Sequence, residues 1–530
     1  MREKGRNHMA HALVKLEVSQ KQAYIFSSNK MKDNVLNSAV IAWIMSPDYF
    51  ADIVKADGRK ELFSEAENLV YSGGGHIVLD YEEKETAVSF VRLITSQIHK
   101  EYSGIEIFAK VLDYSDGDRK NAKSMIRKME ELSQALEKKK SERLSAFHQG
   151  TFGIEKIDST TLKPTLKSVN GKKYEGQIMP KTEEEIEDAL SPVGYNLVNK
   201  FEDLGGSYGE SSFIAVVHID GNAMGARVKT IYDGGKSDKR AKWDKFKDKL
   251  KNFSDSIDDD FKGAYKDMIQ VVQENLEKGQ LSELDLKENN FPVRRIITAG
   301  DDICFVTDGR IGIECAVAFI NALSKKRNKQ DKAGYSACAG VAIVHQKYPF
   351  YQAYELAEKL CSNAKKFGAS ISDKGEISAI DWHIEYGEMK DTLDEIRDQY
   401  NTVDNYRLEL RPYVVMPEKS KDKEKIRQYC YFKKLMNDMR KTKFFSSRSK
   451  MKEFRSVLKQ GNTAVDAFVK FNKMEEISKT VLQVYTEKEI KEILNQGGLK
   501  GSWFDSGKDG VKRSLLFDVL EAADTYIAFK

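Results

Sequence analysis

Residues 293–306 read Val-Arg-Arg-Ile-Ile-Thr-Ala-Gly-Asp-Asp-Ile-Cys-Phe-Val, and this stretch decides how the chain folds. Two apolar runs, Val293–Thr298 and Ile303–Val306, flank Ala299-Gly300-Asp301-Asp302. Gly and Asp are typical turn residues, so the pattern predicts a β-hairpin with the adjacent carboxylates of Asp301 and Asp302 at its tip. Taken alone, the same residues also fit an ordinary surface turn.

A further acid follows another apolar run: Phe213–Ile219 leads directly into Asp220. One acid at a strand end and two on a neighbouring hairpin is how palm-type nucleotidyl transferases hold two divalent ions, about 3.5–4 Å apart, for in-line displacement. Oxygen ligands favour Mg²⁺. We therefore expect two Mg²⁺ or Mn²⁺ ions per site, bound by Asp220, Asp301 and Asp302 as the catalytic carboxylates. A backbone carbonyl of Ile219 or Gly221 is the expected additional ligand.

The loop after Asp220 is the predicted nucleotide site. Gly221 and Gly225 leave backbone N–H groups open, and the N-terminus of the next helix favours a triphosphate through its dipole. A helix cap is the alternative interpretation of the Asp-Gly pair. The residues expected to contact ATP are Gly221, Asn222, Ala223, Met224, Gly225, Gly300 and Lys365.

Two of these residues have competing interpretations. Lys365 lies near the end of a predicted helix 350–367, where a cation serves either a phosphate or the helix dipole. Asn222 is a candidate for binding a ribose hydroxyl or a base edge. His218 and His345 are expected to be structural histidines.

The composition describes a long, well-charged chain. Its 530 residues are too many for one core and predict about three or four domains. The formal charge of +4 argues neither for nor against a nucleic-acid partner. No apolar run approaches the roughly 18–20 residues of a membrane span, and the N-terminus has no secretory signal pattern. The five cysteines form no Cys-x-x-Cys pair, which favours a reduced cytoplasm and argues against zinc.

The predicted elements occur in the same order twice: a strand, helices, a hairpin, a helix and a strand. The first copy comprises Ala12–Val18, Lys30–Ile44, the hairpin 69–79, Thr86–Ile98 and Ile105–Leu112. The second comprises Phe213–Ile219, helices within 226–280, the hairpin 293–306, Ile311–Ser324, Ser336–Val344, Phe350–Phe367 and Ile377–Ile384. Internal duplication is the economical explanation. The first hairpin has Gly where the second has its two aspartates, so the first copy is predicted to be non-catalytic.

Charged helices are predicted between and after the two copies. We expect helices over Asp118–Gln149 and Thr182–Phe201, with an irregular stretch 150–180 between them. After Tyr386 nearly everything reads as helix, except Val414-Val415.

From Lys419 to Lys459 the tail is dense in Lys and Arg, interleaved with aromatic residues. This pattern predicts either an RNA-binding surface with stacking aromatics or an amphipathic helix pair with the aromatics in its core. The aromatic residues concerned are Tyr429, Tyr431, Phe432, Phe444, Phe445 and Phe454.

Three segments together resemble the second palm domain of the CRISPR type III signalling polymerase, the large effector subunit related to GGDEF diguanylate cyclases. They are His218–Gly225, Ala299–Asp302 and Gly340–Tyr351 with Ala357–Lys365. The resemblance is specific over 206–386 and weaker over 12–115, where Leu16–Phe26 is similar to the family's first palm.

The resemblance implies an α/β (α+β) fold with two ferredoxin-like palm domains, a helical connector and a helical C-terminal domain. The implied division is 1–115 for the degenerate first palm, 116–205 for the connector, 206–388 for the catalytic second palm and 389–530 for the helical domain. Asp301 and Asp302 match the family's paired aspartates, and Asp220 matches its strand-end metal ligand. Ala299 replaces the family's usual first Gly.

The resemblance also implies a function: synthesis of a cyclic oligoadenylate-like second messenger and pyrophosphate from ATP, in the cytoplasm, in antiviral defence. The sequence shows no His-Asp nuclease pair and no cysteine cluster between the palms, so we expect a short form without DNase activity or zinc.

Two alternatives stay open. One is a non-catalytic or RNA-activated scaffold subunit of a type III complex, which would contact guide or target RNA and other effector subunits through the basic helical tail. The other is a cyclic dinucleotide synthase. The two palms can pair within one chain or between chains, so a homo-oligomer is also among the expected states.

Overall fold

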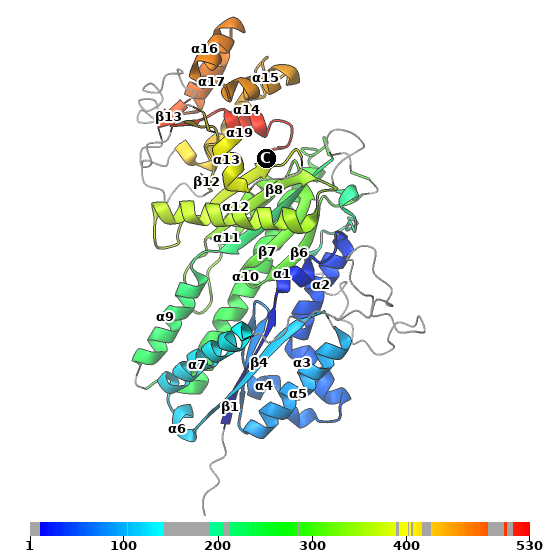
Figure 1. The fold of residues 1–530 in the computed structure, drawn as a ribbon, viewed down its shortest axis with the longest axis vertical. Helices are drawn as coiled ribbons and strands as arrows, with labels where there is room; N and C mark the ends of the chain where they lie inside the picture. Colours follow the sequence, from blue (N-terminus) through cyan, green and yellow to red (C-terminus); the bar gives the residue numbers. More distant parts are fainter. Residues whose placement is uncertain are drawn as a thin grey trace, which may run out of the picture.

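Each half of the chain builds its own β-sheet (Figure 1). A computed structural model describes residues 11–102, 104–142, 190–204, 212–238, 240–284, 286–287, 289–387, 392–400, 402–403, 406–415, 426–485, 503–505 and 512–530. None of the described helices combines the length and the apolar character needed to cross a lipid bilayer.

The first sheet has the strand order β2-β3-β1-β4, and its strands pair antiparallel throughout. Its strands are β1 (His11–Ser19), β2 (Leu69–Gly73), β3 (His76–Tyr81) and β4 (Glu106–Tyr114). The helices of this half are α1 (Lys21–Ile25), α2 (Met31–Ile44), α3 (Pro47–Ala56), the 3₁₀ helix η1 (Lys60–Leu62), α4 (Glu65–Asn68), α5 (Lys84–Glu101), α6 (Asp116–Arg119) and α7 (Ala122–Ser141).

The second sheet has the order β12-β9-β8-β5-β7-β6. Its strands are β5 (Phe213–Gly221), β6 (Val293–Ala299), β7 (Asp302–Asp308), β8 (Ala337–His345), β9 (Ala379–Ile384) and β12 (Tyr413–Val414). The helices between these strands are α9 (Met224–Ser237), α10 (Trp243–Glu277), α11 (Gly312–Ser324) and α12 (Phe350–Ile371).

The two halves share one topology. The order β6-β7-β5-β8 in the second sheet repeats β2-β3-β1-β4 in the first, with helices and a hairpin at the same places along the chain. This is the β-α-β-β-α-β, ferredoxin-like arrangement. The predicted α/β fold with two palm-like units is therefore confirmed.

Both faces of the second sheet are buried. Because side chains alternate along a strand, neighbouring residues of one strand point into opposite cores. In β5, Ala215, Val217 and Ile219 face one core, which contains α10 and α11. Ile214 and Val216 face the other core, which contains α12 and the helices of the first half. Burial on both faces explains why β5 reads as a continuous apolar run rather than an alternating one.

The 35-residue helix α10 joins the two halves. Trp243, Phe246 and Leu250 in its first turns pack with Leu13 and other residues of the first sheet. Phe261 and its apolar neighbours further along the helix pack against the second sheet. In Figure 1 the helix runs from the blue sheet up to the green one.

The C-terminal part is mostly helical, as predicted. Its helices are α13 (Leu393–Tyr400), α14 (Tyr429–Met439), α15 (Arg448–Leu458), α16 (Asn462–Phe471), α17 (Glu475–Val484) and α19 (Phe517–Glu521). It also contains a small sheet that the sequence did not predict, formed by β10 (Thr402–Val403), β11 (Tyr406–Arg407), β13 (Trp503–Asp505) and β14 (Lys512–Ser514). Strands this short leave no periodicity, and β11 pairs with β14 across a long sequence separation.

One predicted helix is wrong over its described part. Residues 191–200 of the expected helix Thr182–Phe201 are irregular, and a 3₁₀ helix, η2, covers Phe201–Asp203. Pro192 removes a helical hydrogen bond, and Gly194 has a φ of +82°, which is incompatible with a helix. The remainder of that helix, 182–189, and the stretch 150–180 lie outside the described residues. Helix α7 ends at Ser141, within the predicted Asp118–Gln149.

Candidate active site

The strand pairing brings the three predicted aspartates to one end of the second sheet. Asp220 on β5 lies directly opposite Asp302 on β7 in the antiparallel register. Asp301 occupies the hairpin tip beside Gly300, whose φ of +64° permits the tight turn. The backbone N–H of Gly221 donates to the carbonyl of Asp301 at 3.2 Å. The hairpin and the strand end therefore form one structural unit.

Gly221 is needed at this position for steric reasons. A Cβ atom there would lie 2.9 Å from Cβ of Asp301 and 3.1 Å from the ring of Phe261. Any side chain would push the hairpin tip away from β5. The glycine after Asp220 thus sets the spacing of the carboxylates.

The site holds more negative charge than its surroundings neutralise. Burial, and next the charge of Asp220, raise the pKa of Asp301 to about 6 and that of Asp302 to about 7. Oδ1 of Asp302 is buried and accepts no hydrogen bond from any described residue, although Nδ1 of His218 lies 3.5 Å away. Burial lowers the pKa of His218, so the imidazole is a poor counter-ion. A cation is the ligand that this arrangement fits.

Lys365 supplies one positive charge. Its Nζ lies 2.6 Å from Oδ2 of Asp220 and donates to the carbonyl of Gly221 at 3.0 Å. Burial opposes the charged form, but the hydrogen bond and charge of Asp220 outweigh it and raise the pKa of Lys365. Because α12 continues to Ile371, Lys365 does not belong to the last turn of the helix. The helix-dipole interpretation is therefore wrong, and Lys365 is part of the site.

The described residues contain no group of three His, Cys, Asp or Glu side chains arranged to hold a metal ion alone. Mg²⁺ in nucleotide enzymes is usually bound by one or two carboxylates together with substrate phosphates. Asp220, Asp301 and Asp302 are the residues that would hold such an ion together with a nucleotide.

Asn222 has a different role from the predicted one. Its side-chain amide donates to the carbonyl of Ile377 at 2.8 Å and to Oγ of Ser336 at 3.3 Å. Its backbone N–H donates to the carbonyl of Ser336 at 2.9 Å. With both amide hydrogens in use and the residue buried, Asn222 ties the loop to the segments just before β8 and β9 rather than facing a ribose or a base.

The start of α9 retains free space for an anion. Ala223, at the N-cap, has a φ of 58° and provides no side-chain cap, so the first N–H groups of the helix have no side-chain acceptor there. A Cβ atom on Gly225 would meet nothing within 4 Å. Met224 packs against the core below. Helix N-termini of this kind bind phosphate groups.

The first half reaches this site through residues to which the sequence analysis assigned no role. The amide of Gln22 on α1 donates to the hydroxyl of Tyr354 and to Oε1 of Glu358 on α12, each at 3.1 Å. Lys21 donates to the carbonyl of Gly74 in the first hairpin. Its positive charge offsets part of the rise that burial and Asp220 cause in the pKa of Asp302. Only the polar run Gln20-Lys21-Gln22 directly after a buried strand hints at this contact.

The aromatic residues of the basic tail are in the core. Tyr429, Phe432, Phe444 and Phe454 are buried, and Tyr431 and Phe445 pack against the same cluster. The amphipathic interpretation of these aromatic residues is confirmed, and the four buried rings are not available to stack on RNA bases in this structure. Residues 419–425 lie outside the described part.

The comparisons with known proteins agree with this geometry. The family model of the Cas10/Cmr2 second palm domain matches residues 213–372. No curated protein sequence gives a significant match.

Three solved structures share the fold. A chain of the Csm1–Csm4 cassette in complex with cA3 aligns with a TM-score of 0.55 and 13% identity over 100% of this chain and 71% of that chain. The cassette in complex with cA4 gives 0.54 and 13% over 100% and 71%. Csm1 of T. onnurineus gives 0.54 and 13% over 97% and 70%. Residues 213–372 therefore match the second palm domain of the Cas10/Cmr2 family, and the chain shares the fold of Csm1.

Proposed function

We propose that this chain is a metal-dependent nucleotidyltransferase that condenses ATP into a cyclic oligoadenylate. The observation that carries the proposal is the cross-strand pair Asp220 and Asp302 with Asp301 beside it, a group of carboxylates without enough counter-charge. The family match over 213–372 and the description of relatives in complex with cA3 and cA4 support it.

In the proposed reaction a ribose 3′-hydroxyl oxygen forms a bond to the α-phosphorus of a second ATP. The bond from that phosphorus to the bridging oxygen of pyrophosphate breaks, and the hydroxyl proton leaves. Asp220, Asp301 and Asp302 would hold Mg²⁺ or Mn²⁺, which supplies Lewis-acid stabilisation of the transferred phosphate and a more acidic hydroxyl.

Groups of the chain itself would bind the triphosphate and neutralise its charge. The N–H groups at residues 223–225 would bind the triphosphate, with Gly225 and Gly300 leaving room for it. Lys365 neutralises Asp220 in the structure, and in the reaction it would exchange that carboxylate for a phosphate oxygen. Lys21 lies on the side of the first half and adds positive charge near Asp302.

The test is mass spectrometry of the products formed from ATP, GTP or both, with Mg²⁺ or Mn²⁺. We compare the wild type with the isosteric double variant Asp301→Asn, Asp302→Asn. The control is Asp233→Asn, the same type of substitution at one exposed position of α9. A cyclic product that the double variant loses and the control retains is the expected result, and its mass distinguishes a cyclic oligoadenylate from a cyclic dinucleotide.

A scaffold role is the second candidate function. It is favoured by the description of the matched structures as cassettes of Csm1 with Csm4, in which Csm1 has a protein partner. In this case the purified chain would bind ATP without forming product, and product would appear only with partner subunits and RNA, or not at all. Copurification with RNA and small subunits distinguishes this candidate from a self-sufficient enzyme.

A further inference from the structure

The helix that carries Lys365, α12, is held at its start by the first half of the chain. The contacts come from a segment that begins in α1, residues 22–29, which we call the docking segment. Gln20, with a φ of 50°, turns the chain from β1 into this segment. A non-glycine residue keeps such a left-handed conformation only where the structure around it requires it. The direction of the docking segment is therefore fixed.

The docking segment caps α12 and packs against its first turns. Oδ1 of Asn29 accepts a hydrogen bond of 3.1 Å from the backbone N–H of Phe350, the first residue of the helix. The helix's own N-cap residue, Pro349, provides no side-chain acceptor. The ring of Phe26 lies 4.1 Å from that of Tyr354 and 5.5 Å from that of Phe350, measured between ring centres. Because side-chain caps and close packing stabilise a helix end, the start of α12 has a fixed place on the first half.

Gln22 contacts two side chains of α12 that lie near Asp302. Its amide nitrogen donates to the hydroxyl of Tyr354 and to Oε1 of Glu358, each at 3.1 Å. Both hydrogens of this nitrogen are therefore in use. Burial and Asp220 raise the pKa of Asp302 most, and the negative charge of Glu358 adds to the rise because the two carboxylates are close. Gln22 thus joins the first half to α12 beside the candidate active site.

Tyr354 links this contact to Asp302. Its ring lies edge-on to the ring of His218, with 5.5 Å between the centres and 81° between the planes, and both residues are buried. Nδ1 of His218 lies 3.5 Å from Oδ1 of Asp302, and neither atom has a hydrogen-bond partner among the described residues. Burial, and next the charge of Asp302, raise the pKa of Tyr354. A shift of the Tyr354 ring would therefore change what surrounds the Asp302 carboxylate.

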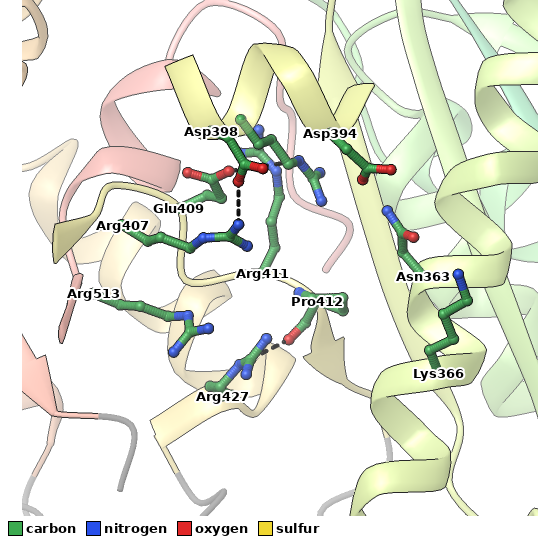
Figure 2. Close-up of a pocket in the computed structure, with 11 residues that line it drawn as sticks. Asn363, Lys366, Asp394, Asp398, Arg407, Glu409, Arg411, Pro412, Arg427 and Arg513 are labelled. Atoms are coloured by element: carbon green, nitrogen blue, oxygen red, sulfur yellow. Dashed lines mark hydrogen bonds and ion pairs between the residues drawn. The ribbon is translucent and has the colours of Figure 1, made fainter. Parts of the chain in front are cut away.

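The later turns of α12 border open space on one side. A cavity of about 350 Å³ lies beside them, and Asn363 and Lys366 line it (Figure 2). None of the described residues that line this cavity belongs to the first half. Lys365, next to Lys366, lies 2.6 Å from Asp220. The position of Lys365 therefore depends on how firmly the first turns of the helix are held.

We propose that Gln22 is a positioning residue for the active site of the second half. It holds Tyr354 and Glu358 of α12 in place. Through Tyr354 and His218 it keeps the carboxylate of Asp302 in the orientation that the structure shows. The inference rests on the proposed function, in which Asp302 holds Mg²⁺ or Mn²⁺. Groups that orient a metal ligand from behind affect metal affinity and rate without touching the metal.

The experiment uses the full chain and two readouts. The first is the rate of product formation from ATP with Mn²⁺, separated into kcat and KM. The second is the dissociation constant of Mn²⁺ in the presence of an ATP analogue with a methylene bridge between the α- and β-phosphorus. Electron paramagnetic resonance measures this constant without any turnover. Thermal unfolding of each variant reports its folding.

The variants remove or exchange the hydrogen bond between Gln22 and Glu358. Gln22→Leu removes it, and Gln22→Glu places a second carboxylate beside Glu358. The double variant Gln22→Glu, Glu358→Gln restores one donor and one acceptor at exchanged places, and the new carboxylate can accept from the hydroxyl of Tyr354. The matched control is Gln97→Leu, because Nε2 of Gln97 donates to Oε1 of Glu101 at 2.6 Å on α5 in the same half.

We expect Gln22→Leu and Gln22→Glu to lower kcat and to weaken Mn²⁺ binding, each about tenfold, since loss of a group that orients a metal ligand typically has effects of this size. KM for ATP should stay within about twofold, because Gln22 is not among the groups proposed to bind the triphosphate. The double variant should recover most of both losses, and Gln97→Leu should change neither. Reduced stability alone would lower the number of active molecules but leave the dissociation constant of Mn²⁺ unchanged.

The proposal is overturned if folded Gln22→Leu keeps the kcat and the Mn²⁺ affinity of the wild type. It is also overturned if the folded double variant recovers neither quantity, if Gln97→Leu lowers both equally, or if the wild type binds no Mn²⁺. A wild type that binds Mn²⁺ but forms no product would refute the proposed function instead. The Mn²⁺ affinities of the variants would then decide the positioning role of Gln22 by themselves.

Discussion

Gly340→Ala should destabilise the second palm and displace Lys365 from the candidate site. Gly340 lies on β8 where α12 crosses it, and a Cβ atom there would lie 2.0 Å from the carbonyl oxygen of Ala357 and 2.3 Å from the backbone nitrogen of Cys361. Ordinary contacts begin at 3.4 Å, so the helix must retreat from the sheet by more than about 1 Å.

The loss of folding stability should be near the upper end of the range observed when a packed core is overfilled. Inserting a methyl group into a packed core typically costs about 1–3 kcal/mol, and here both clashing atoms belong to a helix backbone that has no rotamer to change. We therefore expect about 3 kcal/mol, or a fall in Tm of roughly 6–12 °C for a unit of about 200 residues. Lys365, 2.6 Å from Asp220 in the wild type, moves with α12, so product formation should fall as well.

The assay is thermal and denaturant unfolding followed by near-ultraviolet circular dichroism, which reports packing of the palm. Gly234→Ala is the matched control, because a Cβ atom there meets nothing within 4 Å on the exposed face of α9. Ala in place of Gly inside a helix should stabilise by about 0.5–1 kcal/mol. Stability of Gly340→Ala within about 0.5 kcal/mol of the wild type would refute the close packing of α12 on β8.

Three further outcomes are expected. Lys365→Met should change stability by less than about 1 kcal/mol, since its ion pair with Asp220 is partly exposed. It should nevertheless slow product formation about tenfold or more in a mass-spectrometric assay. An unchanged rate would show that Lys365 has no part in the reaction. In the metal-free protein, the contribution of Asp301 and Asp302 to stability should fall as pH rises from about 4 to 7. The unfolded chain releases these protons near pH 4, whereas folded Asp301 and Asp302 hold them up to about pH 6 and 7. Denaturant titrations across this range should show a flatter slope for Asp302→Asn, and an equal slope would contradict the assignment. Arg397→Met should cost about 3–5 kcal/mol of stability, because the buried Asp381 loses both hydrogen bonds from Arg397 and keeps one ion pair among the described residues, the longer one of 3.8 Å with Arg411. The double variant with Asp381→Leu should recover most of that loss in urea unfolding.

The sequence alone predicted those features that depend on neighbouring residues. The apolar runs and Gly-Asp turn of 293–306 were enough to predict the hairpin, and the run ending at Asp220 predicted its partner strand. Repetition of the same order of elements predicted two units of one topology, which the sheet orders confirm. These signals are readable because strand periodicity and turn chemistry act over a few residues.

Tertiary structure alone decided which side chains meet over long separations. Lys365 reaches Asp220 because Gly340 admits α12, and Asn222 faces away because Ile377 and Ser336 take its amide hydrogens. Four aromatic residues of the tail are buried, and Arg411 meets Asp518 and Glu521 more than 100 residues further along the chain. The physical reason is that these contacts follow from how helices pack on sheets, which depends on side-chain volumes throughout the core and leaves no local pattern in the chain.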